Sequence, residues 1–299
     1  MNTLRISCSF LGLGAFLALS ASGCGDLFDS PNTAKASLHA HSDGGSTPDG
    51  GETPAPPPGM VLIPGGKFLM GCVPGDPSCT PGEQPQHAVQ LAGYYLDAHE
   101  VTIARYAACV KDGVCMEPTT STTSAANCNW GIAGREQHPV NCLTWAQADA
   151  FCHWDNKALP TEAQWEKAAR GGVDGKKYPW TLDKIDCSLV VWNGGASTSG
   201  KGCDHSGTLP AGSRPGNGYG LYDMAGNVWE WVADWYGDDY YAASPAVAPT
   251  GPTFGSNRAA RGGGFADGEA RNFRASARNS LYPTDGAADL GFRCARAVP

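Results

Sequence analysis

Long apolar segments and basic residues are both scarce in this sequence of 299 residues. The apolar run at residues 10–19 is too short to cross a bilayer as a helix. Only 21 Lys and Arg residues stand against 29 Asp and Glu residues. This acidic excess argues against nucleic acid as a general partner.

Several catalytic and metal-binding motifs are also missing. The ten cysteines from Cys72 to Cys294 include no CxxC pair, which argues against a zinc ribbon. The sequence has no Ser/His/Asp signature and no phosphate-binding loop. The His99–Glu100 pair is isolated, and we predict that its role is structural.

The N-terminus has the features of an export signal. A polar start that carries only Arg5 precedes the apolar run, and small residues then lead to Cys24. Cys24 after Ala-Ser-Gly is similar to a bacterial lipobox, so we predict a signal peptide at 1–24 and a lipid anchor on Cys24 that holds the chain to a membrane of the bacterial envelope. Ordinary secretion is the alternative.

Residues 25–58 are polar, rich in Pro, Gly and Ser, and almost free of side chains that could form a core. Such a segment buries too little apolar area to offset its ordering entropy, which predicts a disordered tether. Residues 59–299 remain for one folded domain. Removal of 1–24 takes away Arg5 and no acidic residue, which leaves 20 basic and 29 acidic residues.

The cysteines agree with export. Ten is an even number, and in an oxidising compartment they predict up to five disulfides. Pairs of neighbours in the sequence are our hypothesis for four of these bonds. They are Cys72–Cys79, Cys109–Cys115, Cys128–Cys142 and Cys187–Cys203.

Regular structure is expected to be sparse. Residues 60–71 predict two short strands around a Pro-Gly-Gly turn. Thr102 is a candidate cap for a helix at 103–110. Capping boxes predict two further helices, which begin after Thr144 and Thr161.

Tryptophans gather near residue 230. Trp229, Trp231 and Trp235 could stack on a sugar or a peptide, but in a domain of long loops such side chains more often form the core. We predict that they belong to the core.

Four segments occur in an order that resembles the sulfatase-modifying factor family, whose best-known members are the formylglycine-generating enzymes. They are residues 60–71, 138–145 with 158–170, 217–231, and 261–265 with 290–294. The resemblance implies an α+β fold, namely the loop-rich formylglycine-generating-enzyme variant of the C-type-lectin-like fold, stapled by disulfides. It also implies a Cys152–Cys294 disulfide.

The activity of the family does not follow from this resemblance. Family enzymes oxidise a substrate cysteine with molecular oxygen at a copper(I) ion, which two thiolates hold. Asp267 stands at the position of the first of these cysteines, no cysteine stands near the second, and Gly264 replaces a serine beside the metal. We therefore expect no copper.

A groove beneath residues 261–280 is the predicted binding site, with Arg261, Asp267, Arg271 and Arg274 as contacts for an unidentified protein or small ligand. An acidic ligand would suit these arginines. The alternative is that the guanidinium groups hold long loops through carbonyl and carboxylate groups.

The segment around Asp223 resembles a structural calcium site of the family. The resemblance assigns Asp223 and Glu230 as side-chain ligands and Gly226 and Val228 as backbone ligands. Calcium prefers such carboxylate and carbonyl oxygens. The alternative is an aspartate that caps a turn and a glutamate paired with an arginine.

These features predict an exported member of the family that binds a ligand or a protein without copper chemistry. Two alternatives stay open. One is a divergent family enzyme, either a formylglycine-generating oxidase or an oxidase that uses Asp267 and a different metal. The other is a structural subunit of an envelope complex.

Overall fold

The structure, a computed structural model, describes residues 55–118, 127–180, 184–193, 203 and 206–299. The predicted signal peptide at 1–24, with Cys24, lies outside these residues, as does the predicted tether up to residue 54. None of the helices in the described ranges is long and apolar enough to cross a membrane.

Short strands in the described residues form three small sheets, with the orders β1-β4-β9, β2-β3 and β7-β6-β5-β8. The strands are β1 (Met60–Ile63), β2 (Gly66–Met70), β3 (His87–Leu91), β4 (Tyr94–Asp97), β5 (Trp229–Trp235), β6 (Arg258–Arg261), β7 (Asn279–Leu281), β8 (Leu290–Phe292) and β9 (Ala295–Ala297). All neighbours are antiparallel except β5 and β8, which run parallel.

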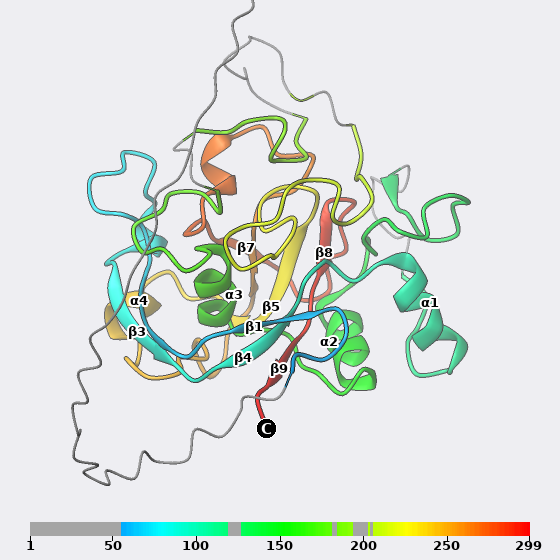
Figure 1. The fold of residues 1–299 in the computed structure, drawn as a ribbon, viewed down its shortest axis with the longest axis horizontal. Coiled ribbons are helices and arrows are strands. Elements are labelled where there is room, and N and C mark those ends of the chain that lie inside the picture. The colour runs from blue at the N-terminus through cyan, green and yellow to red at the C-terminus, as the bar shows by residue number, and fades with distance from the viewer. Residues whose placement is uncertain (1–54, 119–126, 181–183, 194–202, 204–205) are drawn as a thin grey trace, which may run out of the picture. The chain divides into compact units, whose positions relative to one another are not determined.

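The helices are equally short. They are α1 (Ile103–Lys111), α2 (Trp145–Trp154), α3 (Glu162–Ala169) and α4 (Tyr240–Ala243), with 3-10 turns η1 (Pro81–Glu83) and η3 (Ala270–Phe273). In Figure 1, α1 and α2 lie together on one flank and α4 lies on the opposite flank.

The three predicted helices are present, and their caps have the predicted form. The hydroxyl oxygen of Thr102 accepts a hydrogen bond from the amide of Arg105 at the start of α1. Thr144 and Thr161 both complete capping boxes, in which the Gln three residues later bonds back to the amide of the threonine. Local capping chemistry therefore fixes where the helices begin.

The two strands predicted within residues 60–71 are also present, but they belong to different sheets. Strand β1 pairs with β4, and β2 pairs with β3. At this switch Gly65 lies against Gly93, and a Cβ on Gly65 would come within 2.9 Å of the Gly93 amide nitrogen. Two chain reversals therefore pack back to back, which requires a residue without a side chain.

Two main hydrophobic clusters form the core. One joins β2, β3 and β4 to α3 around Trp165, and the other joins α1 and α2 to β8 around Phe151. Trp229 and Trp231 are buried, at 5% and 0% exposed, so the core role predicted for them is confirmed. Trp235 is half-buried and packs against Arg258.

All five predicted disulfides are confirmed. Cys152–Cys294 closes the longest loop, with a separation of 142 residues, and ties α2 to the end of β8. The other four join the sequence neighbours named above. Five disulfides in one domain indicate an exported or extracellular protein.

Four arginines are almost completely buried and hold the loops between these elements. Arg170, Arg261, Arg274 and Arg293 are each 2% exposed or less. Arg261 donates to the carbonyls of Ala275, Ser276 and Ala277 and also pairs with Glu166.

Glu166 on α3 lies at the centre of this arrangement. Its two oxygens accept hydrogen bonds from Arg170 and Arg261, and the amide of Gly71 donates a third. Burial acts to raise the pKa of Glu166, but the two guanidinium groups outweigh it and hold the pKa below the ordinary value. The carboxylate therefore stays charged inside the core.

Replacing Glu166 with alanine is expected to destabilise the protein by about 3–5 kcal/mol, because two buried guanidinium groups lose their partner. Urea denaturation measures this change. The exposed Glu117 is the control, and its replacement with alanine should change the free energy of unfolding by less than about 0.5 kcal/mol. Equal effects of the two substitutions would contradict the role assigned to Glu166.

Candidate functional site

The loop after β6 contains Asp267, one of the four residues predicted at the binding site. The carboxylate folds back on its own loop. One oxygen accepts from the amide of Gly264 at 2.8 Å, and the other accepts from the side-chain amide of Asn272 at 2.8 Å. The indole of Trp192 donates to the backbone carbonyl of Asp267. Asp267 therefore acts as a local clamp on residues 264–272.

Gly264 makes a close contact with a second carboxylate residue, Asp289. A Cβ built on Gly264 would lie 2.7 Å from the Cβ of Asp289 and 2.8 Å from one of its carboxylate oxygens. No side chain fits at position 264 while Asp289 occupies this place. Position 264 therefore requires a glycine in this chain.

Asp267 and Asp289 are close enough to interact electrostatically. Burial raises the pKa of Asp289 to about 6, and the charge of Asp267 adds to the increase. Burial also raises the pKa of Asp267, although the bonds from Gly264, Asn272 and Trp229 oppose the shift. A pair of partly buried acids therefore lies at this loop.

Aromatic side chains form the inner wall of this site. Trp192 is 2% exposed and packs against Phe273, which is fully buried, with the ring centres 5.2 Å apart. Residues 266 and 268–271 form the exposed side of the same loop.

The structure corrects two of the four predicted binding residues. Arg261 and Arg274 are 0% and 1% exposed, and their guanidinium groups bond to carboxylates and carbonyls of the chain itself. Both side chains lie on the core side of the loop and are therefore not available at the surface. This agrees with the alternative that the guanidinium groups hold long loops. Arg271 is exposed and Asp267 is half-buried, so these two remain at the site.

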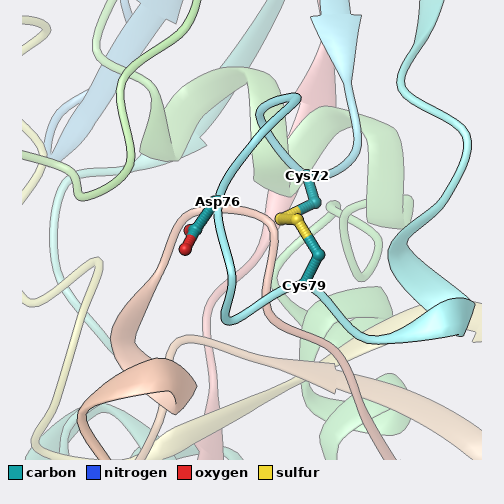
Figure 2. Close-up of side chains that lie close together, drawn as sticks. All are labelled: Cys72, Asp76 and Cys79. Atoms are coloured by element: carbon teal, nitrogen blue, oxygen red, sulfur yellow. A yellow bond between two sulfur atoms is a disulfide. The ribbon is translucent and has the colours of Figure 1, made fainter.

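The ten cysteines from Cys72 to Cys294 are all held in disulfides. In the described residues one group of potential metal ligands clusters within 4.8 Å, namely Cys72, Asp76 and Cys79 (Figure 2). Its two sulfur atoms are bonded to each other, so neither is a thiolate ligand while the disulfide is intact.

The predicted calcium segment has its oxygens engaged by protein donors. Both oxygens of Glu230 pair with Arg293, at 2.6 and 2.7 Å, and the indole of Trp165 donates to the same carboxylate. Asp223 accepts a 2.6 Å hydrogen bond from the amide of Gly212. The predicted calcium ligands therefore also have hydrogen-bond partners within the chain, which leaves calcium a prediction.

Sequence reasoning missed Glu100 as a member of this cluster. Its fully buried carboxylate accepts from the side-chain amide of Asn227 at 2.7 Å and from the amide of Val228. Burial raises the pKa of Glu100 well above the ordinary value, and the charges of Asp223 and Glu230 raise it further. Glu100 lies three residues after the end of β4, but its contact residue Asn227 lies 127 positions away, so no local pattern marks the contact.

The same cluster borders a cavity of about 550 Å³. His99 and Glu100 lie on its wall with Asp97 and Arg105. His99 stacks on Tyr222 with ring centres 4.5 Å apart, and burial lowers its pKa. The predicted groove beneath 261–280 and this cavity have no lining residue in common.

The fold and these segments define a family. Residues 47–298 match the Sulfatase-modifying factor enzyme 1-like domain, and the chain belongs to this family. The predicted α+β class, in the family's loop-rich variant of the C-type-lectin-like fold, is therefore confirmed.

The relatives include proteins named as formylglycine-generating enzymes and one that is named as inactive. The formylglycine-generating enzyme of Streptomyces coelicolor is 37% identical over 282 residues, which cover 79% of this chain and 88% of the relative. The mouse inactive C-alpha-formylglycine-generating enzyme 2 is 31% identical over 276 residues, with 80% and 85% covered.

Solved structures show a similar fold over most of the chain. PvdO from Pseudomonas aeruginosa superposes with a TM-score of 0.65 at 27% identity, covering 80% of this chain and 94% of PvdO. The Treponema denticola variable protein 1 superposes with a TM-score of 0.61 at 27% identity, covering 80% and 95%.

Asp289 provides a pH test of the acid pair. Its pKa of about 6 in the folded state exceeds the ordinary 3.8, so its stabilising contribution is complete below about pH 4 and is lost as the pH rises through 6. Replacing Asp289 with asparagine should remove this loss. The gain in stability at pH 7 should be about 1–2 kcal/mol. This is less than the whole pKa shift would give at about 1.4 kcal/mol per unit, because the side chain is partly exposed and solvent screens its charge.

Thermal or urea unfolding of wild type and variant between pH 4 and 8 measures this difference. Replacing the exposed Glu269 of the same loop with glutamine is the control, which should give a flat difference across the range. A variant that is no more stable than wild type at pH 7 would show that the pKa of Asp289 is not raised in the folded state.

Proposed function

We propose that this chain is an exported, lipid-anchored member of the sulfatase-modifying factor family that binds a ligand or protein partner and holds no copper. The observation that carries the proposal is the state of Asp267. Its carboxylate closes the loop on Gly264 and Asn272, at the position where the family has a catalytic thiol.

The ligand set argues in the same direction. Copper(I) prefers soft thiolate ligands, and the sequence has no cysteine between Cys203 and Cys294. Cys203 and Cys294 themselves are in disulfides. A relative named as inactive supports the view that the family fold persists without the activity.

The exposed side of the loop is the proposed binding surface. We define it as residues 266–271, in which Arg271 and Glu269 offer charges of both signs. The bonds from Gly264 and Asn272 to Asp267 and the packing of Trp192 against Phe273 fix the loop that carries this surface. A surface fixed in this way loses little conformational entropy when a partner binds.

The envelope location rests on two features. Five disulfides agree with an oxidising compartment, and Cys24 supplies a site for lipidation. The tether at 25–58 would allow the domain to reach a partner at some distance from the membrane.

The acid pair is the observation that favours the enzyme alternative. Asp267 and Asp289 could hold a hard metal ion at the family's catalytic position, because carboxylates suit such ions. In that case the protein would be a divergent oxidase. The third possibility, a structural envelope subunit, would need neither Asp267 nor Arg271.

A two-armed experiment on the mature protein separates these functions. In the first arm the protein is incubated with copper, oxygen and a Cys-x-Pro-x-Arg peptide, and the aldehyde product is trapped with a hydrazide. We expect no turnover beside the active Streptomyces coelicolor enzyme. Turnover that disappears when Asp267 is replaced with alanine would support the enzyme instead.

In the second arm a photo-crosslinking residue replaces Ala270, with the exposed Ala297 as the matched position on β9. We expect a defined crosslinked partner at 270, and its loss when Arg271 is replaced with glutamate. Replacing the exposed Arg296 with glutamate is the matched charge reversal and should leave the crosslink unchanged. The absence of a crosslinked partner at both positions, 270 and 297, would favour the structural role.

We also propose calcium at the segment 223–230. Three carboxyl groups, those of Glu100, Asp223 and Glu230, are buried near Arg293, and Arg214 also acts on Asp223. The acids outnumber the arginines, and a divalent cation would offset this surplus. Burial raises the pKa of Asp223 to about 6, as expected for a carboxylate in this environment. Binding would require Glu230 to share its oxygens between Arg293 and the ion.

If calcium binds here, a concentration 100 times the Kd should stabilise the folded state by about 2.7 kcal/mol. For a domain of this size the melting temperature should then rise by roughly 5–10 °C. Chelation should reverse the shift, and the variant Asp223→Asn should show little of it. Magnesium is the control, because it accommodates such irregular sites poorly. An identical melting temperature with calcium and with chelator would exclude the site.

A further inference from the structure

The disulfide Cys72–Cys79 differs from the other four in its surroundings. Cys72 is 3% exposed, whereas Cys79 is partly exposed at the surface. The two cysteine residues therefore differ in their exposure to solvent. Figure 2 shows the bond at the base of a loop that projects from the end of β2.

A buried guanidinium group lies against the inner sulfur. Nη1 of Arg274 is 3.0 Å from Sγ of Cys72, within hydrogen-bonding distance for sulfur. In the residues that the structure describes, no comparable arginine contact is found at the sulfurs of Cys187–Cys203, the other disulfide with partly exposed cysteines.

We propose that Cys72–Cys79 is a thiol-exchange site, at which a low-molecular-weight thiol attacks Cys79 and releases Cys72 as a thiolate held by Arg274. Partial exposure of Cys79 admits a small reagent, while the burial of Cys72 excludes attack there. The proposal does not depend on the proposed function, since it involves neither Asp267 nor Arg271.

The chemistry is balanced at each step. The thiolate of the reagent forms a bond to Sγ of Cys79, and the electron pair of the old sulfur–sulfur bond leaves with Sγ of Cys72. A second reagent thiolate attacks the mixed disulfide, giving reduced Cys79 and the oxidised dimer of the reagent. Exchange is faster when the leaving thiol has a low pKa, and a neighbouring guanidinium lowers it.

Other charges around Cys72 must also be counted. Arg274 pairs with both oxygens of Glu83 at 2.7 Å and lies 3.8 Å from Asp76. Asp76 pairs in turn with Lys177 at 3.0 Å. The two acids and two bases balance, so the new thiolate is the one unbalanced charge, and the direct bond from Arg274 is what stabilises it.

The fold tolerates opening of this bond. Cys72 and Cys79 are 7 residues apart, so the bond closes a small loop and constrains the unfolded chain less than the 142-residue separation of Cys152–Cys294. The amide of Cys72 also donates to the carbonyl of Glu83, and Gly71 bonds to Glu166, which anchors the strand independently of the disulfide.

The test exposes the native mature protein to glutathione, quenches at short times, alkylates the free thiols and maps every cysteine by mass spectrometry. We expect glutathione on Cys79 with free Cys72, and an exchange much faster than at Cys109–Cys115, whose sulfurs are both buried. Glutathione on Cys72, or exchange no faster than at Cys109–Cys115, would overturn the proposal.

The variant Arg274→Gln tests the leaving-group role. Exchange at Cys72–Cys79 should slow on the order of tenfold. Cys187–Cys203 in the same molecule is the matched control, and its rate should not change. Equal slowing at both bonds, or none at either, would remove Arg274 from the reaction. If the variant does not fold, the position of glutathione in the wild-type protein still decides the proposal.

Discussion

The fold depends on guanidinium groups that lie inside it. Long loops carry backbone carbonyls that helices and sheets do not satisfy, and a buried carbonyl without a donor is costly. An arginine offers five donors in a fixed plane, so one side chain can serve several carbonyls and a carboxylate together. Arg261 does this for three consecutive residues, and Arg293 does it for Asp97, Ala98 and Tyr222.

Each of these arginines needs an acid, and the acids link the elements to one another. Glu166 on α3 joins Arg170 and Arg261, while Glu83 on η1 holds Arg274. Buried ion pairs add little net stability compared with apolar packing, but loss of one partner is strongly unfavourable. The network therefore acts mainly by specifying one arrangement of the loops.

Local sequence signals predicted what local chemistry decides. The capping threonines Thr144 and Thr161 located two helix starts, because both partners of a capping box lie within four residues. Neighbouring cysteines predicted four disulfides for a similar reason. The pairing of β1 with β4 instead of β2 could not be predicted, since it depends on the back-to-back contact of Gly65 with Gly93.

The candidate site was less predictable because its residues face in different directions. Asp267 and Arg271 were identified at the loop, but the sequence does not reveal that Arg261 and Arg274 point to the core side. Their partners, Glu166 and Glu83, lie 95 and 191 residues away. Asp289 and Glu100 were missed for the same reason, since neither stands in a recognisable motif and each meets its neighbours only in the fold.

Many residues spread over the chain hold the family's fold, whereas an activity depends on a few residues. The frame is distributed over five disulfides and several buried arginine pairs, so a change at one loop leaves most of it intact. The proposed function depends instead on a few side chains of one loop, where Asp267 bonds to Gly264 and Gly264 packs against Asp289. A strong resemblance over most of the chain thus carries the fold, while the function has to be argued from that single loop.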